Sequence, residues 1–179
     1  MKQIKLYGLG GQGVVTAANI FAEAVAIGEN RYAQSIPAYG HERRGAPVYS
    51  DLIISDTPIM VKSFVYHPDY IVIFDLSVVE KGVDVTAGET KNAIYIVNCP
   101  ELPVDVLGKN RKVYWVDART IALESIKRDI PNTTMLGAMA GAGMAGIAAV
   151  TDAITKYFAK AADANAKAAE RAFHELKHN

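Results

Sequence analysis

The chain has 179 residues, half of them hydrophobic, and its 19 Lys and Arg side chains balance 19 Asp and Glu. A chain of this length buries roughly 70% of the surface that its unfolded form exposes, and with no internal repeat or long linker we expect a single domain over residues 1–179. The zero net charge excludes an overall field that would draw the chain to nucleic acid or to an anionic membrane, so neither is an expected partner.

The first predicted strand, residues 4–7, leads through the sequence GLGGQG into a predicted helix at residues 14–27. Gly8, Gly10 and Gly13 have the G-x-G-x-x-G spacing in the strand–turn–helix context of a dinucleotide site. Such a turn brings backbone N–H groups close to an anion at the start of a helix. The candidate binding residues of this turn are Gly8, Gly10, Gly11, Gln12 and Gly13.

A dinucleotide site also needs an acid at the end of the second strand, where it binds a ribose hydroxyl. The second predicted strand, residues 32–36, runs into PAYGHERRGAP without an acid at its end. Glu29 precedes that strand and is therefore on the wrong side. These positions make the simplest dinucleotide interpretation doubtful.

The segment SIPAYGHERRGAPV, residues 35–48, follows this strand and holds the second group of candidates. Arginine guanidinium groups suit the forked binding of phosphate or carboxylate oxygens. The alternative is a structural loop in which Glu42 pairs with one arginine. His41 beside Glu42 resembles a general base only superficially, because adjacent side chains point apart, and we assign no catalytic residue. The candidate binding residues here are Glu42, Arg43, Arg44 and Gly45.

The third predicted strand, residues 48–55, mixes polar and apolar positions, which predicts either a hairpin through residues 59–62 or a place at the sheet edge. Continuous apolar runs then predict buried parallel strands at residues 70–74, 93–98 and 112–117. Asp75 and Asp117 lie at strand ends, where a site residue or a helix cap is equally expected.

Helices dominate the last third of the sequence. The stretch MLGAMAGAGMAGIAAV, residues 135–150, is uncharged but shorter than the roughly 20 residues that span a bilayer. Each of its glycines weakens an isolated helix by about 1 kcal/mol, so we expect a helix packed closely against a sheet, a helix or a partner. The remaining predicted helices are residues 77–81, 119–127, 133–149, 151–159 and 165–177.

The order of these elements predicts an α/β fold with a Rossmann-like, doubly wound, mostly parallel sheet and a helical C-terminal third. The single cysteine, Cys99, excludes an internal disulfide and any iron–sulfur cluster or thiolate zinc site built by this chain alone. No histidine pair has metal-ligand spacing, so we expect no metal site. The lone cysteine also predicts a reducing, cytoplasmic compartment, and the start, MKQIKLYGLG, lacks the features of a signal peptide.

Four ordered segments resemble one known family, the gamma subunits or domains of the 2-oxoacid:acceptor oxidoreductases. They are GLGGQGVVTAANIFAEA, SIPAYGHERRGAPVYSDLIISDTPI, HPDYIVIFD and PNTTMLGAM, and Asn165 with Ala166 fits the C-terminal pattern. The resemblance covers nearly the whole chain. Family members act on pyruvate, 2-oxoglutarate, branched-chain 2-oxoacids, indolepyruvate or phenylglyoxylate.

The resemblance implies a subunit that is inactive by itself within an enzyme of alpha, beta, gamma and delta-type subunits. Partner subunits would carry thiamine diphosphate, Mg and [4Fe-4S] clusters, and this chain alone would bind none of them. The reaction implied is oxidative decarboxylation of a 2-oxoacid with coenzyme A to acyl-CoA, CO2 and reduced ferredoxin or another acceptor. The glycine turn from Gly8 to Gly13 and the segment from Glu42 to Gly45 would face the coenzyme A side of the active site.

One position departs from the family pattern, because His41 stands where the family often has proline; phenylglyoxylate is one substrate compatible with a less common branch. Two alternatives remain open. One is an independent NAD(P)-binding reductase, favoured by the glycine spacing and by arginines suited to a 2′-phosphate. The other is a scaffold in which the glycines serve only close packing of helix and strand.

Overall fold

The computed structural model describes residues 1–37 and 43–179, and its elements are built on one seven-stranded sheet of order β2-β3-β1-β4-β5-β6-β7. β1, β4, β5 and β6 are parallel, whereas β3 is antiparallel to β1 and β2, and β7 is antiparallel to β6. This confirms the predicted α/β class with a mostly parallel sheet. The strands are β1 Lys2–Leu9, β2 Tyr32–Pro37, β3 Pro47–Ser55, β4 Tyr70–Ile73, β5 Ile94–Asn98, β6 Lys112–Val116 and β7 Lys177–His178.

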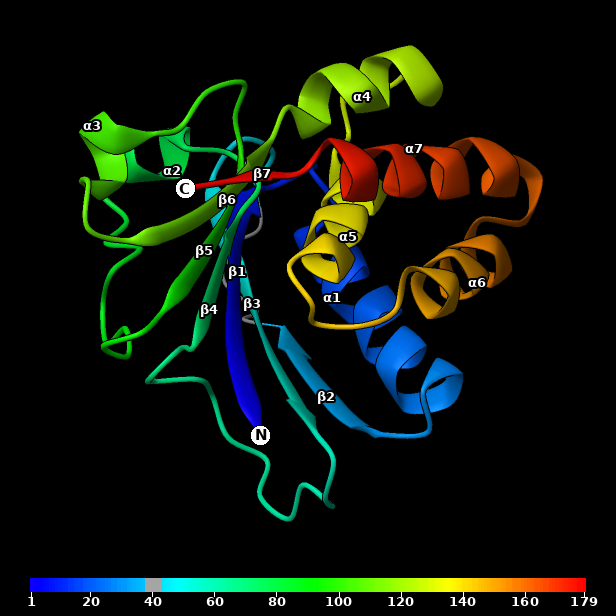
Figure 1. Cartoon of the computed structure of the whole chain (residues 1–179), viewed down its shortest axis with the longest axis horizontal. Coiled ribbons are helices and arrows are strands. Elements are labelled where there is room, and N and C mark those ends of the chain that lie inside the picture. The colour runs from blue at the N-terminus through cyan, green and yellow to red at the C-terminus, as the bar shows by residue number, and fades with distance from the viewer. Residues whose placement is uncertain (38–42) are drawn as a thin grey trace.

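Helices cover both faces of this sheet (Figure 1). α1, α4, α5, α6 and α7 share one hydrophobic core with the sheet, and α2 and α3 pack on the opposite face. The helices are α1 Val14–Glu23, α2 Ser77–Glu80, α3 Val104–Leu107, α4 Ala118–Ser125, α5 Asn132–Gly141, α6 Ile147–Phe158 and α7 Ala162–Glu175, with the π-helix η1 Ala24–Gly28 and the 3-10 helix η2 Ala159–Ala161.

The connections leave the middle of the sheet in opposite directions. After β1, the chain crosses by α1 to β2, whereas β4, β5 and β6 follow one another on the other side of β1. The carboxyl ends of β1 and β4 therefore meet at the point where the winding direction changes. Open α/β sheets bind ligands outside the carboxyl ends of their strands at such a point.

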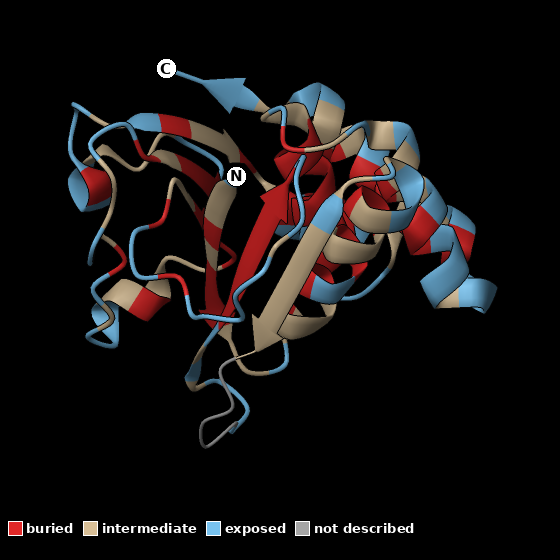
Figure 2. Cartoon of the chain, turned by 90° about the horizontal axis from the view of Figure 1, so that it is seen from below, coloured by how far each residue is buried: buried red, intermediate tan, exposed pale blue. Residues whose placement is uncertain are grey.

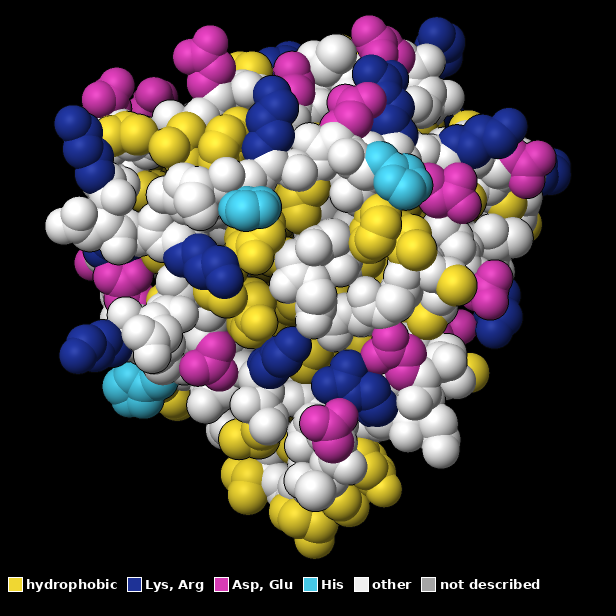
Figure 3. All heavy atoms as spheres, viewed as in Figure 1, with side chains coloured by type: hydrophobic (Ala, Val, Ile, Leu, Met, Phe, Trp, Pro, Cys, Tyr) yellow, Lys and Arg dark blue, Asp and Glu magenta, His cyan; other side chains and the backbone are white. Residues whose placement is uncertain are grey.

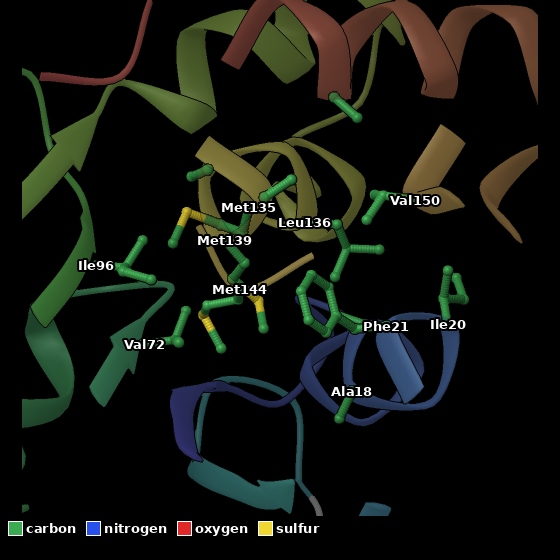
Figure 4. Close-up of a cluster of buried hydrophobic side chains, with 14 of the residues drawn as sticks. Ala18, Ile20, Phe21, Val72, Ile96, Met135, Leu136, Met139, Met144 and Val150 are labelled. Atoms are coloured by element: carbon green, nitrogen blue, oxygen red, sulfur yellow. The ribbon is translucent and has the colours of Figure 1, made fainter. Parts of the chain in front are cut away.

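The larger core lies between the sheet and the C-terminal helices. Met135, Leu136 and Met139 of α5 pack with Phe21 of α1 and Val72 of β4 (Figure 4). The buried residues are concentrated in the sheet and on the helix faces turned toward it (Figure 2). α5 is buried on all sides, which explains why its sequence carries no polar face.

The glycine-rich stretch packs closely, as predicted, but it is not one helix. The expected helix 133–149 ends at Gly141, and a new helix, α6, begins at Ile147. Gly143 in the connection has a φ of 78°, a left-handed conformation that an α-helix cannot contain. The break lets α6 turn and pack against α7 and α1.

The two positions predicted for strand 48–55 are both wrong. Residues 59–62 form no strand, and β3 lies inside the sheet between β2 and β1, so that β2 is the edge strand. Asp51, one of the polar residues in that mixed pattern, is 1% exposed and forms an ion pair with Lys5 of β1, with 3.1 Å between Nζ and Oδ1. A paired charge is compatible with an interior strand, which the pattern of polar positions cannot reveal.

The C-terminus returns to the sheet. The predicted helix 165–177 begins earlier, as α7 at Ala162, and ends at Glu175, after which Lys177–His178 pair with Trp115 and Tyr114 of β6. Throughout the described parts of the chain, none of the helices has the length and apolar character needed to cross a bilayer.

Candidate functional site

A glutamine side chain holds the turn after β1. The Gln12 Oε1 atom accepts the backbone N–H of Leu9 at 2.8 Å, and its Nε2 atom donates to Asp75 Oδ2 at 2.7 Å. Asp75 follows β4, the parallel neighbour of β1, and its other oxygen accepts the N–H of Ser77 at 3.0 Å. The turn is thereby tied to the adjacent strand at the carboxyl edge of the sheet.

The glycine turn lies directly against the segment that carries the arginines. Gly10 N–H donates to Ala46 C=O at 2.8 Å, and Gly45 N–H donates back to Gly10 C=O at 3.0 Å. These bonds extend the antiparallel ladder between β1 and β3 beyond Leu9 and Pro47. A Cβ atom at Gly10 would lie 2.4 Å from Arg43 O, so only glycine permits this contact. The fold therefore places the glycine turn and the arginine segment side by side.

The other two motif glycines also have packing roles. A Cβ at Gly8 would lie 2.6 Å from Val14 Cγ2, because α1 passes close to β1. Gly13 precedes α1 with a φ of 74°, and a Cβ there would lie 2.7 Å from Asn132 Nδ2 of α5. The G-x-G-x-x-G spacing is thus explained by contacts within the chain. In a dinucleotide site, the pyrophosphate approaches the backbone at this glycine. Here the Arg43 carbonyl occupies that space beside Gly10.

A cleft of about 380 Å³ opens beside this turn, at the carboxyl ends of β1, β4 and β5. It is the place at which the winding of the sheet predicts a ligand site. The lining residues are Leu9, Gly10, Gly11, Gln12, Arg44, Gly45, Asp75, Asn98, Arg119, Asp129, Ile130 and Pro131.

The charged groups of the cleft differ in how they are engaged. Arg119 forms a two-pronged ion pair with Asp129, with N–O distances of 3.0 and 2.7 Å. Burial by itself would raise the pKa of Asp75, but the hydrogen bonds from Ser77 and Gln12 and the nearby Arg119 outweigh it and hold that pKa below its ordinary value. Asp75 is thus an ionised structural acceptor. Arg44 is exposed at the rim, where its guanidinium is accessible to an anion.

Several predicted residues meet in this cleft and others do not. Gly10, Gly11, Gln12, Arg44 and Gly45 line it, whereas Gly8, Gly13 and Arg43 do not. Glu42 and His41 lie outside the described residues. The helix-cap alternative is confirmed for Asp117, which accepts the N–H of Thr120 at 3.0 Å.

Sequence reasoning missed three polar lining residues. Asn98 is the last residue of β5, and Arg119 lies two residues after Asp117, the cap of α4, so both lie where apolar strands end at the same edge. This position at the strand ends was the sequence signal that could have identified them as site residues. Asp129 has no such indication, because it reaches the cleft only through its pairing with Arg119 ten residues earlier.

The low pKa of Asp75 predicts a pH-dependent stability contribution. A carboxylate whose pKa is lower in the folded state stabilises above its unfolded pKa, near 4, and this contribution is lost as the pH falls through the folded pKa. We expect Asp75→Asn to lower the free energy of unfolding at pH 7, and the difference from wild type to vanish toward pH 2. Urea unfolding across that pH range measures it, with the exposed Asp105→Asn as the control. An equal deficit at both pH values would contradict the assignment.

The described residues hold no cluster of three or more His, Cys, Asp or Glu side chains arranged to bind a metal. Burial, with a smaller effect of Asp117, raises the pKa of the Cys99 thiol to about 12, so the thiol stays protonated at neutral pH. Fold and cleft together define an α/β chain with an arginine-rimmed cleft at its winding switch point.

Comparison with known proteins assigns this chain to a family. The family model for pyruvate ferredoxin/flavodoxin oxidoreductase matches residues 3–175. The chain therefore belongs to that family, as a gamma-type subunit of a multi-subunit 2-oxoacid oxidoreductase.

Individual relatives match over their full length. The chain is 46% identical to the pyruvate/ketoisovalerate oxidoreductases common subunit gamma of Pyrococcus abyssi, over 99% of this chain and 98% of that one. It is 41% identical to the pyruvate synthase subunit PorC of Methanothermobacter marburgensis, over 100% and 99%. The crystal structure of the pyruvate oxidoreductase subunit PORC from Thermotoga maritima has a TM-score of 0.86 at 33% identity, covering 99% and 98%.

Proposed function

We propose that this chain, as a single cytoplasmic gamma domain over residues 1–179, forms the coenzyme A side of a 2-oxoacid:acceptor oxidoreductase. The enzyme would convert a 2-oxoacid and coenzyme A to acyl-CoA and CO2 and pass two electrons to ferredoxin or another acceptor. The relatives' names make pyruvate and ketoisovalerate the first substrates to test. Alpha, beta and delta-type subunits complete this assembly, and their thiamine diphosphate, Mg and [4Fe-4S] clusters supply the decarboxylation and electron transfer.

The observation that carries the proposal is the cleft at the carboxyl edge, with Arg44 at its rim and Arg119 in its wall. Coenzyme A brings several phosphate groups, and guanidinium groups bind phosphate oxygens in a forked geometry. The backbone of the turn contributes less than its glycines suggest, because the N–H groups of Gly10 and Gln12 already donate to Ala46 and Leu9. Arg44 is the residue that we assign to phosphate binding.

The structure does not supply the acid that the NAD(P) alternative lacks. Asp75 follows β4 rather than the second strand, and Gln12 and Ser77 already bond its two oxygens. The Arg43 carbonyl lies over Gly10, where the pyrophosphate of a dinucleotide would need to approach. Micromolar binding of NADH or NADPH to the isolated chain, measured by fluorescence titration, would favour this alternative.

The scaffold alternative is favoured by the packing roles of Gly8, Gly10 and Gly13 and is tested by one substitution. In the assembled enzyme, we expect Arg44→Ala to raise the KM for coenzyme A about tenfold, the loss of one exposed charge-assisted hydrogen bond, with the KM for the 2-oxoacid unchanged. Arg171→Ala, on α7 and outside the cleft lining, is the control. Steady-state kinetics with each substrate varied in turn measures both constants. An unchanged KM for coenzyme A would contradict phosphate binding by Arg44 and favour the scaffold role.

A further inference from the structure

The connection between β3 and β4 is an exposed apolar segment. It comprises residues 57–66, TPIMVKSFVY, and is called the β3–β4 segment below. Met60 is 87% exposed, Val61 68%, Phe64 47% and Tyr66 69%. Figure 3 shows hydrophobic side chains gathered at the lower end of the molecule, where Figure 1 places this connection. Contiguous apolar surface of this kind marks an interaction site more often than isolated exposed residues do.

The segment is held in place by a buried ion pair. Val65 N–H donates to Asp51 Oδ2 at 2.8 Å, and Lys5 Nζ donates to Val65 C=O at 2.9 Å. Val65 is 1% exposed, and its neighbours Phe64 and Tyr66 are turned to the outside. The backbone is therefore held at Val65 before any partner binds, which lowers the entropic cost of ordering the segment on association.

Two hollows flank the segment, and Ile59 and Met60 line both of them. One, of about 450 Å³, separates the segment from the edge strand β2 and includes Tyr32 and Lys62. The other, of about 420 Å³, includes Met1. The segment thus forms a ridge between two concavities, a shape that receives apolar side chains from a partner on either side.

The charge of the segment restricts what can face it. Lys62 is its only charged residue and is exposed. Asp56, just before it, is engaged by Arg31 with 2.7 Å between Nε and Oδ1. A second copy of this chain, docked by its own β3–β4 segment, would offer no acid from that segment to Lys62. Complementarity therefore favours a different chain with a carboxylate at this place.

We propose that the β3–β4 segment is the surface through which this chain docks another subunit of its own oxidoreductase, one that presents an apolar groove with a carboxylate opposite Lys62. The proposal rests on the proposed function, in which this chain acts only within an assembly. The cleft at the carboxyl edge remains separate from this surface, because the two share no lining residue.

The test uses the tagged full-length chain, co-expressed with the subunits encoded beside its gene and purified by the tag. The readout is the amount of each co-expressed subunit retained, quantified by mass spectrometry. We expect Tyr66→Glu and Val61→Glu each to reduce retention at least tenfold. Lys62→Glu should reduce it about threefold, whereas Lys62→Arg, which keeps the positive charge, should retain the wild-type amount. Tyr157→Glu, which places the same change on the exposed face of α6, is the matched control and should stay within twofold of wild type.

The outcomes separate the two proposals. Retention by wild type and equally by Tyr66→Glu would overturn the docking surface and leave the proposed function standing. Failure of wild type to retain any of these subunits would overturn the proposed function, and the docking surface with it. An isolated chain that light scattering shows to be a dimer, dissociated by Tyr66→Glu and not by Tyr157→Glu, would assign the surface to a second copy and overturn the proposal. Variants are compared only where thermal unfolding lies within a few degrees of wild type.

Discussion

Replacing Gly137 with alanine is expected to destabilise the protein by about 3 kcal/mol, the upper part of the range for an overfilled core. A Cβ at this position would lie 1.9 Å from Ala169 O and 2.6 Å from Ala169 C, both backbone atoms of α7. Because backbone cannot rotate away as a side chain does, α5 and α7 must separate to admit the methyl group. The higher helix propensity of alanine offsets only about 1 kcal/mol of this cost.

Gly141→Ala in the same helix is the matched control. A Cβ atom at Gly141 would lie 2.8 Å from Leu176 Cδ2, its nearest neighbour, which is the flexible end of a side chain. We expect that variant to remain within about 1 kcal/mol of wild type, because the leucine can rotate while alanine favours the helix. Thermal unfolding measures both, and a loss of about 3 kcal/mol corresponds to a fall in Tm of roughly 6–12 °C for a chain of this size. Equal Tm values for the two variants would show that α5 and α7 are not in such close contact.

Asp51→Ala is expected to cost about 3 kcal/mol, because it leaves the Lys5 ammonium, largely buried, without its partner. The variant also removes the acceptor of the Val65 N–H, so the β3–β4 segment loses its attachment to the sheet. Amides of residues 57–66 should then exchange hydrogen faster than in wild type. Chemical denaturation measures the first effect and hydrogen–deuterium exchange the second.

A double variant distinguishes the ion pair from the space that it fills. Lys5→Met with Asp51→Ala removes both charges and should recover at least half of the lost stability, since no charge remains buried and unpaired. Glu175→Ala serves as the control for an exposed pair, because its partner Arg171 is on the solvent side of α7. We expect that change to cost less than about 0.5 kcal/mol. A double variant no more stable than Asp51→Ala would mean that the ion pair is not the source of the loss.

The sequence located six of the seven strands and most of the helices, because local periodicity reflects burial; it missed β7, Lys177–His178, which lies where a helix was predicted to end. Apolar runs such as those of β4 and β5 are covered on both faces, and their residues are buried as the pattern predicts. The four ordered motifs also identified the family, which the comparisons confirmed. Errors occurred where a distant group changed the meaning of a local pattern. The mixed polar pattern that includes Asp51 indicated a sheet edge. Inside the sheet, however, the charge of Asp51 is paired with Lys5, which lies 46 positions away in the chain.

The glycine turn shows most clearly which features local sequence determines and which depend on tertiary packing. Its spacing, its place between strand and helix, and its family were determined by the sequence, since they depend on residues next to one another. What each glycine does was decided by the tertiary structure: Gly10 admits the carbonyl of Arg43, Gly13 admits Asn132 of α5, and Gln12 reaches Asp75 across 63 residues. Local sequence reports conformational freedom and burial, whereas the atom that occupies the space beside a glycine is set by how distant segments pack.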